Sequence, residues 1–145
     1  MPPVEAAYKK MAAHSWLQDW ANWLRHDNRI NIGGSGIHPL ARLMGSSSGG
    51  IFREVNEDRA QAVQDVWAHM VSQARNKKLT RFQRRTFALY AFVLKLEYME
   101  GRWTRFEMVS HIAGKYRWPT YNERSLLNHL GASVTYVGQR LGIGS

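Results

Sequence analysis

The sequence concentrates its basic side chains in one region, where phosphate is the ligand that they could bind. Between residues 75 and 105 there are nine Lys and Arg against Glu97 and Glu100, a net charge of 9 − 2 = +7, whereas the whole 145-residue chain carries +9. Such a surface binds nucleic-acid backbone in a salt-dependent way, although a charged run can also be only a solvated face. The residues predicted to contact phosphate are Arg75, Lys77, Lys78, Arg81, Arg84 and Arg85.

A second set of polar side chains lies in and around the stretch YRWPTYNERS, from Tyr116 to Ser125. Arg can bind guanine through two hydrogen bonds, and Asn can bind adenine in the same way. In a helix-turn-helix, the first turns of the second helix present such side chains to the major groove of DNA. The alternative is that these residues cap a helix or are merely solvated. The predicted DNA-binding residues are Thr120, Tyr121, Asn122, Arg124, Ser125 and Asn128, with His129 at the edge of the set, and also Arg102, Arg105 and Arg117.

Helices must position both sets, because apolar residues recur at spacings of three and four and no strand pattern competes. We expect a single all-α domain over residues 1–145, consisting of a Trp-rich helix (1–25), a Gly/Ser-rich loop (26–55) and a helical body (56–145). The Trp stripe of the first helix is either core or a contact for a protein partner. Its members are Trp16, Trp20 and Trp23.

Local signals place the helix boundaries within the helical body. A helix from Asn56 should end near residues 75–78, and Thr80 should cap the next, which carries Phe82 on its apolar face and ends at Gly101. Two capping boxes then start the last two helices, giving about five helices with a helix-turn-helix at about residues 104–141. The boxes are Thr104 with Glu107 and Thr120 with Glu123.

Several classes of protein are disfavoured by composition. The chain has no Cys, and its six His show no metal-binding spacing, so no metal or cofactor is expected. We therefore expect no enzyme, although folding could still bring carboxylates together for a metal-dependent nuclease. No apolar run reaches the roughly 18 residues that a membrane span needs. A soluble, cytoplasmic protein without a membrane partner is the resulting expectation.

The C-terminal run from Leu96 to Leu141 resembles the bacteriophage late-gene antitermination Q proteins, in particular the zinc-free type of lambdoid phage 21. The elements that carry the resemblance are a Tyr-x-x-Gly turn, an Ile-Ala pair in a short helix, small residues in the middle of the final helix and a Val-x-x-x-Leu end. Upstream, SWLQDWANWLR is similar to the family's Trp-rich first helix. In this sequence the C-terminal elements are Tyr98 to Gly101, Ile112-Ala113, Gly131-Ala132 and Val137 to Leu141.

This resemblance implies a transcription antitermination factor in the cytoplasm of a bacterial host. Such a factor binds a DNA element beside the late promoter through a helix-turn-helix similar to sigma region 4. It then loads onto host RNA polymerase, paused with its sigma factor, and narrows the RNA-exit channel so that a terminator hairpin cannot fold. The implied partners are the polymerase, contacted by the three Trp of the first helix, double-stranded DNA and nascent RNA.

One feature departs from the family pattern, because the connection between Lys115 and Tyr121 is longer than the family's usual turn. The orientation of the second helix is therefore the least determined part of the prediction. The alternative function is a helix-turn-helix repressor or activator with no role in elongation.

Overall fold

The computed structural model describes residues 7–25 and 57–143, and all regular structure within these ranges is helical. The all-α prediction is confirmed. The predicted Gly/Ser-rich loop and the cap at Asn56 lie outside the described residues. The elements are α2 (Ala12–Trp23), α5 (Glu57–Gln73), α6 (Arg81–Leu94), a π-helix η2 (Lys95–Glu100), α7 (Arg105–Lys115) and α8 (Glu123–Leu141).

The predicted helix starts at Thr80 and Thr104 are confirmed. The Thr80 hydroxyl accepts a hydrogen bond from the Gln83 backbone N–H, and Thr104 accepts one from Glu107 in the same way. In both boxes the side chain of the third helical residue accepts a hydrogen bond from the cap's own backbone N–H. Reciprocal bonds of this kind satisfy donors that a helix start otherwise leaves unpaired, so both starts are set locally.

The predicted start of the last helix at Thr120 is wrong by two residues. Asn122 is the cap: its side-chain oxygen accepts from the Ser125 backbone N–H at 2.9 Å, and α8 begins at Glu123. Asn caps a helix at least as well as Thr. The later start also leaves Tyr121 before the helix, where only 5% of its surface is exposed. Burial of this ring therefore accompanies the shift in register.

The predicted first helix is interrupted. Residues 7–9 form a short helical turn, and α2 starts only after a break at Met11, whose backbone is extended and whose side chain forms no cap. The break accompanies the burial of Tyr8, which is 0% exposed. Tertiary burial of one ring thus overrides the continuous helical periodicity of this segment.

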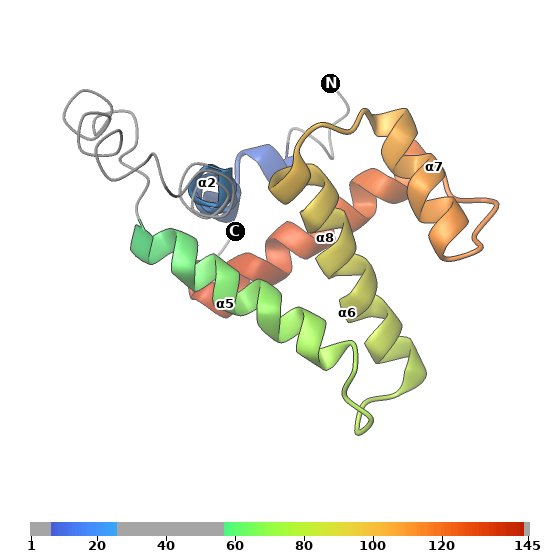
Figure 1. Cartoon of the computed structure of the whole chain (residues 1–145), viewed down its shortest axis with the longest axis horizontal. Coiled ribbons are helices and arrows are strands. Elements are labelled where there is room, and N and C mark those ends of the chain that lie inside the picture. Colours follow the sequence, from blue (N-terminus) through green and yellow to red (C-terminus); the bar gives the residue numbers. More distant parts are fainter. Residues whose placement is uncertain (1–6, 26–56, 144–145) are drawn as a thin grey trace, which may run out of the picture.

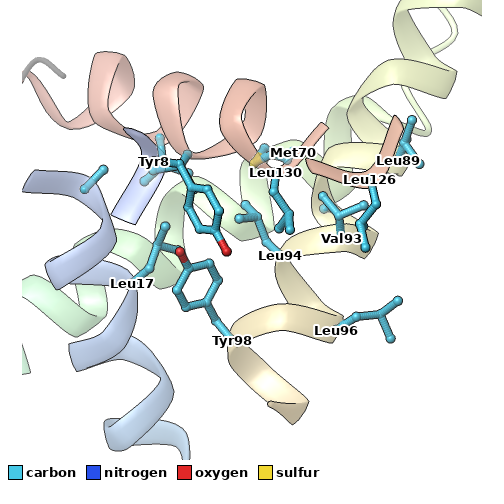
Figure 2. Packing of buried hydrophobic residues seen from close by; sticks show 14 of the residues in the cluster. Tyr8, Leu17, Met70, Leu89, Val93, Leu94, Leu96, Tyr98, Leu126 and Leu130 are labelled. Carbon is cyan, nitrogen blue, oxygen red and sulfur yellow. The ribbon is translucent and has the colours of Figure 1, made fainter. Parts of the chain in front are cut away.

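The helices surround a core to which each of them contributes. In Figure 1, α5 and α6 form two arms that meet at the connection of residues 74–80, and α8 crosses both arms. The N-terminal helix α2 packs on α5, and α7 packs on α8. Figure 2 shows Leu126 of α8 close to Leu89 and Val93 of α6, and the rings of Tyr8 and Tyr98 turned toward each other. All these side chains belong to one buried hydrophobic cluster.

The long helix formed by α6 and η2 ends at Gly101, as predicted. Gly101 has φ +64°, in the left-handed region, and its N–H bonds to the carbonyl of Leu96. A Cβ at this position would collide with the guanidinium of Arg25, which donates a hydrogen bond to the carbonyl of Tyr98 at 3.0 Å. The left-handed backbone therefore favours Gly here, whereas the guanidinium of Arg25 is the end of a flexible side chain that can move aside.

Candidate nucleic-acid interface

Two parts of the predicted interface that are distant in the sequence meet in the structure. The N-terminal half of α6 and the α7–α8 connection line a groove of about 750 Å³, which we call the arginine groove. It brings Arg81 and Arg85, predicted to contact phosphate, together with Arg117, predicted to contact DNA. None of its eight described lining residues is acidic. They are Arg81, Phe82, Arg85, Thr86, Leu89, Arg117, Trp118 and His129.

Aromatic rings hold the guanidinium of Arg85 in this groove. Its Cζ lies 5.9 Å from the ring centroid of Tyr116 and 5.6 Å from that of Trp118. Trp118 in turn packs against Tyr121 and His129, with ring centroids 5.1 and 5.7 Å away. Cation–π contacts of this kind orient an Arg without neutralising its charge. The groove therefore presents a positioned cation that is available to an anion.

Arg117 enters the groove from an unusual backbone position. Its φ is +51°, in the left-handed region that residues with a Cβ adopt at a cost of about 1–2 kcal/mol. The Trp118 N–H bonds to the carbonyl of Ala113 and the Arg117 N–H to that of Gly114, which is the hydrogen-bond pattern of a Schellman helix end. Gly is the usual residue at this position. Arg therefore occupies a place where Gly would be more stable.

The start of α8 exposes part of the predicted reading edge. Arg124 and Asn128, one helical turn apart, are both exposed. Asn122 and Thr120 are also exposed, but Asn122 and Ser125 are engaged with each other as the capping box. Arg124 and Asn128 are therefore the members of the set best placed to read bases.

Tyr121 must be removed from the predicted DNA-binding residues, because it is 5% exposed. Its hydroxyl lies 2.8 Å from Nδ1 of His129, and the two rings stack at 5.4 Å between centroids. Burial raises the pKa of Tyr121 and lowers that of His129. His129 therefore adds no cation to the arginine groove at neutral pH. The stacked rings of Tyr121 and His129 instead pack against the ring of Trp118.

The other cations of the basic region lie elsewhere. Arg75, Lys77 and Lys78 are exposed at the α5–α6 connection and do not line the groove. Arg84 is half-buried, and its Nε is buried without a hydrogen-bond partner within the described residues. The predicted phosphate-binding run is thus divided by the fold, and only Arg81 and Arg85 belong to the groove.

Arg102 and Arg105, both predicted to contact DNA, differ in what they bind within the chain. Arg105 forms an ion pair with Glu97 at 2.7 Å and donates a hydrogen bond to the Tyr8 hydroxyl at 3.0 Å. Its guanidinium therefore connects α7, η2 and the N-terminal segment, which makes it a poor DNA ligand. Arg102 is exposed, with its guanidinium 5.0 Å from the ring centroid of Trp103.

Of the three Trp predicted to contact polymerase, Trp20 must be removed from that set. It is 0% exposed, and its indole N–H donates to the side chain of Gln64 in α5 at 2.8 Å. Trp16 and Trp23 are half-buried. The guanidinium of Arg59 lies 5.0 Å from the Trp16 ring centroid. The stripe therefore acts mainly as the contact between α2 and α5, and only Trp16 and Trp23 retain surface.

Phe82, the groove residue that sequence reasoning missed, was expected on an apolar face but is 67% exposed. Phe82 lies seven positions before Leu89, so both follow one periodic stripe, yet only Leu89 is buried. The difference arises because Phe82 is in the first turn of α6, near the end of the two-armed core. Helical periodicity shows on which face of its own helix a residue lies. It carries no information on where the neighbouring helices that could cover that face end.

A separate polar cavity of about 700 Å³ lies against α2 and η2. Its lining includes His14, Glu97, Tyr98 and Arg105. Nδ1 of His14 lies 2.6 Å from the Tyr98 hydroxyl, and burial lowers the pKa of His14. Within residues 7–25 and 57–143, no group of three or more His, Asp or Glu could hold a metal ion. None of the described helices is long and apolar enough to cross a membrane.

No family model, no curated protein and no solved structure matches the chain.

Proposed function

We propose that the chain is a transcription antitermination factor of the phage late-gene class. It binds a double-stranded DNA element near a late promoter, loads onto paused host RNA polymerase and narrows the RNA-exit channel, so that terminator hairpins cannot fold. The proposal combines the resemblance of residues 96–141 to the Q proteins with the net charge of +9. The action is steric and requires no catalytic group.

The observation that carries the nucleic-acid part of this proposal is the convergence of Arg81, Arg85 and Arg117 in the arginine groove. These residues come from two segments more than 30 positions apart, and none of the described residues that line the groove with them is acidic. A cluster of guanidinium groups with no acid among them binds phosphate oxygens well, because each group can form two parallel hydrogen bonds with them. Beside the groove, the exposed Arg124 and Asn128 offer the side-chain types that recognise guanine and adenine.

Transcription in vitro tests the proposal. A template that carries the chain's own late promoter region followed by an intrinsic terminator is transcribed by host polymerase with its sigma factor. Added protein should increase the read-through product, whereas a template with an unrelated promoter should show no increase. Unchanged termination on the cognate template would refute the proposed function.

The double variant Arg81→Ala/Arg117→Ala connects the assay to the groove. It should reduce read-through and also reduce the salt dependence of nucleic-acid binding, because two phosphate contacts are lost. Arg140→Ala is the control: this exposed Arg is in the last turn of α8, about 26 Å along the helix from its start. It removes one cation without touching the groove and should leave read-through unchanged.

The second candidate is a DNA-binding repressor or activator that never follows the polymerase. The exposed edge formed by Arg124 and Asn128 favours it, since that edge requires only DNA. Under this alternative, Arg124→Ala weakens binding to the cognate element by about 1–3 kcal/mol, and polymerase beyond the promoter carries no protein. Co-purification of the protein with stalled elongation complexes would exclude this alternative.

A further inference from the structure

We propose that the arginine groove is a site for single-stranded nucleic acid, in which one unpaired base packs on Phe82 while the flanking phosphates bind Arg81 and Arg117. This inference rests on the proposed nucleic-acid function and assigns a separate surface within it. Double-stranded DNA is bound by the exposed edge of α8, whose residues Arg124 and Asn128 do not line the groove.

The size of the groove favours a single strand. Its volume of about 750 Å³ lies within the range of pockets that hold small molecules, about 300–1,000 Å³. A base with its sugar and phosphate fits such a space, but a paired base inside a stacked duplex cannot enter it. Reading a base in the groove therefore requires that the base be unpaired.

The chemistry of the groove matches both halves of a nucleotide. Phe82 exposes 67% of its surface beside Arg81 and one helical turn before Arg85. Surfaces that bind single strands combine such aromatic rings with cations that follow the backbone, because every base has a face that can stack. Guanidinium groups alone would bind the phosphates of a duplex equally well. The exposed ring of Phe82 is therefore the feature that favours a single strand over a duplex.

Contacts within the chain also position parts of the groove before a strand binds. Arg85 is held over Tyr116 and Trp118, and Arg117 is held in the left-handed conformation by the Schellman hydrogen bonds. The Thr86 hydroxyl donates to the carbonyl of Phe82 at 2.9 Å within the same wall. A site whose cations are already positioned loses less side-chain freedom when a strand binds.

Fluorescence anisotropy with labelled oligonucleotides tests the site. The probes are a short oligothymidylate, an oligouridylate of equal length and a blunt duplex, which separate single-stranded DNA from RNA and both from double-stranded DNA. Phe82→Ala should weaken single-strand binding by about 5- to 150-fold, the loss expected for one stacked base, and should leave duplex binding unchanged. Phe82→Trp should restore the single-strand affinity. Preference for one of the two single strands identifies whether the natural ligand is DNA or RNA.

Phe106→Ala is the matched control. Phe106 is 79% exposed, in the first turn of α7, and lines a different, smaller pocket with Trp103 and His111. Removing it deletes a ring that is at least as exposed as Phe82 but lies outside the arginine groove, so single-strand affinity should not change. Arg124→Ala should show the reverse of Phe82→Ala, with weaker duplex binding and unchanged single-strand binding.

Three outcomes would overturn the inference. One is equal losses for duplex and single strand in Phe82→Ala, which would make the groove a general phosphate surface. Another is wild-type protein that binds the duplex but neither single strand, which would leave the proposed function standing. The last is a Phe82→Ala variant that keeps single-strand affinity but no longer co-purifies with polymerase, which would assign the groove to a protein partner.

Discussion

The ends of α7 and α8 have the same backbone geometry but different residues at the critical position. After α8, Gly142 has φ +74°, and Ile143 bonds back to the carbonyl of Gly138. After α7, Arg117 has φ +51°, and Trp118 bonds back to Ala113 in the same pattern. Gly adopts this conformation without strain, whereas a residue with a Cβ does not. The end of α8 is thus built for stability, and the end of α7 places a guanidinium in the arginine groove at some cost in stability.

The largest expected effect comes from removing the core contact that holds the first turn of α8, just after the α7–α8 connection, against α6. Leu126 is fully buried, and Figure 2 shows it against Leu89 and Val93 of α6. Leu126→Ala should reduce the free energy of unfolding by about 2–5 kcal/mol, measured by urea denaturation, because it leaves a cavity. It should also weaken single-strand binding by the folded protein, since the connection and α6 are no longer held together.

Leu130→Ala is the comparison for that variant. Leu130 is equally buried one turn further along α8, away from the connection. Leu130→Ala should lose about as much unfolding free energy as Leu126→Ala, while the folded variant should keep its affinity for single strands. Equal losses of affinity in both variants would show that the groove depends on overall stability rather than on the local contact.

Removing the N-cap of α8, Asn122, should have the next largest effect. Asn122→Ala removes the side-chain acceptor for the Ser125 N–H and should cost about 1 kcal/mol of unfolding free energy. Thr120→Ala, at the position predicted from sequence to be the cap, should change stability by less than about 0.5 kcal/mol. A larger loss from Thr120→Ala than from Asn122→Ala would contradict the observed start of α8.

Gly142→Ala tests the end that is built for stability. A Cβ at this position meets no atom within 4 Å, so the substitution acts only through the backbone. We expect a loss of about 1 kcal/mol in unfolding free energy, measured by urea denaturation, because the left-handed conformation becomes strained. Nucleic-acid affinity should stay unchanged, since α8 ends far from the groove.

Arg117→Gly tests the other end and should act in the opposite direction. Relief of the left-handed strain should raise the unfolding free energy by up to about 1 kcal/mol, while the greater freedom of Gly in the unfolded chain offsets part of the gain. Single-strand affinity should fall, since one phosphate contact is lost. A variant that is less stable and binds normally would show that Arg117 has a structural role instead of a binding one.

The smallest expected effect is a pH dependence near the end of α7, where His129 supports Trp118. Burial lowers the pKa of His129 in the folded protein, so the unfolded chain binds the proton more readily. Stability should therefore decrease as the pH falls through the ordinary His value of 6.5. His14 shifts in the same direction, so the double variant His14→Gln/His129→Gln should reduce this dependence in urea denaturation. Greater stability at the lower pH would contradict the burial argument.

Much of the helical framework was predictable because its signals are local. The caps at Thr80 and Thr104 and the end at Gly101 depend on residues within one or two turns, and all three are confirmed. The prediction of a cap at Thr120 is wrong because local signals there are ambiguous. Two capping patterns overlap in TYNERS, and both are locally acceptable. Burial of Tyr121 against His129 distinguishes them, and that contact is invisible to a cap rule.

The kinds of side chain in the candidate site were predictable from the sequence, but the particular residues that come together there were predictable only in part. Charge density indicated Arg81 and Arg85 as candidate phosphate contacts, and the helix-turn-helix pattern indicated Arg117 as a candidate DNA contact, so all three Arg of the groove were among the predicted residues. The sequence contained no signal that Arg105 is paired with Glu97 or that Arg84 lies outside the groove. Such assignments depend on which helix faces meet, and those contacts join residues far apart in the chain.

By itself, therefore, the sequence determined the helical class, most of the helix ends and the basic character of the surface, because periodicity, capping and charge act over a few residues. Only the tertiary structure decided that Trp20 and Tyr121 are buried, that Phe82 is exposed and that Arg117 joins Arg81 and Arg85. The physical reason is that burial depends on where neighbouring helices pack and stop. One α-helical stripe can therefore begin in solvent at Phe82 and continue into the core at Leu89.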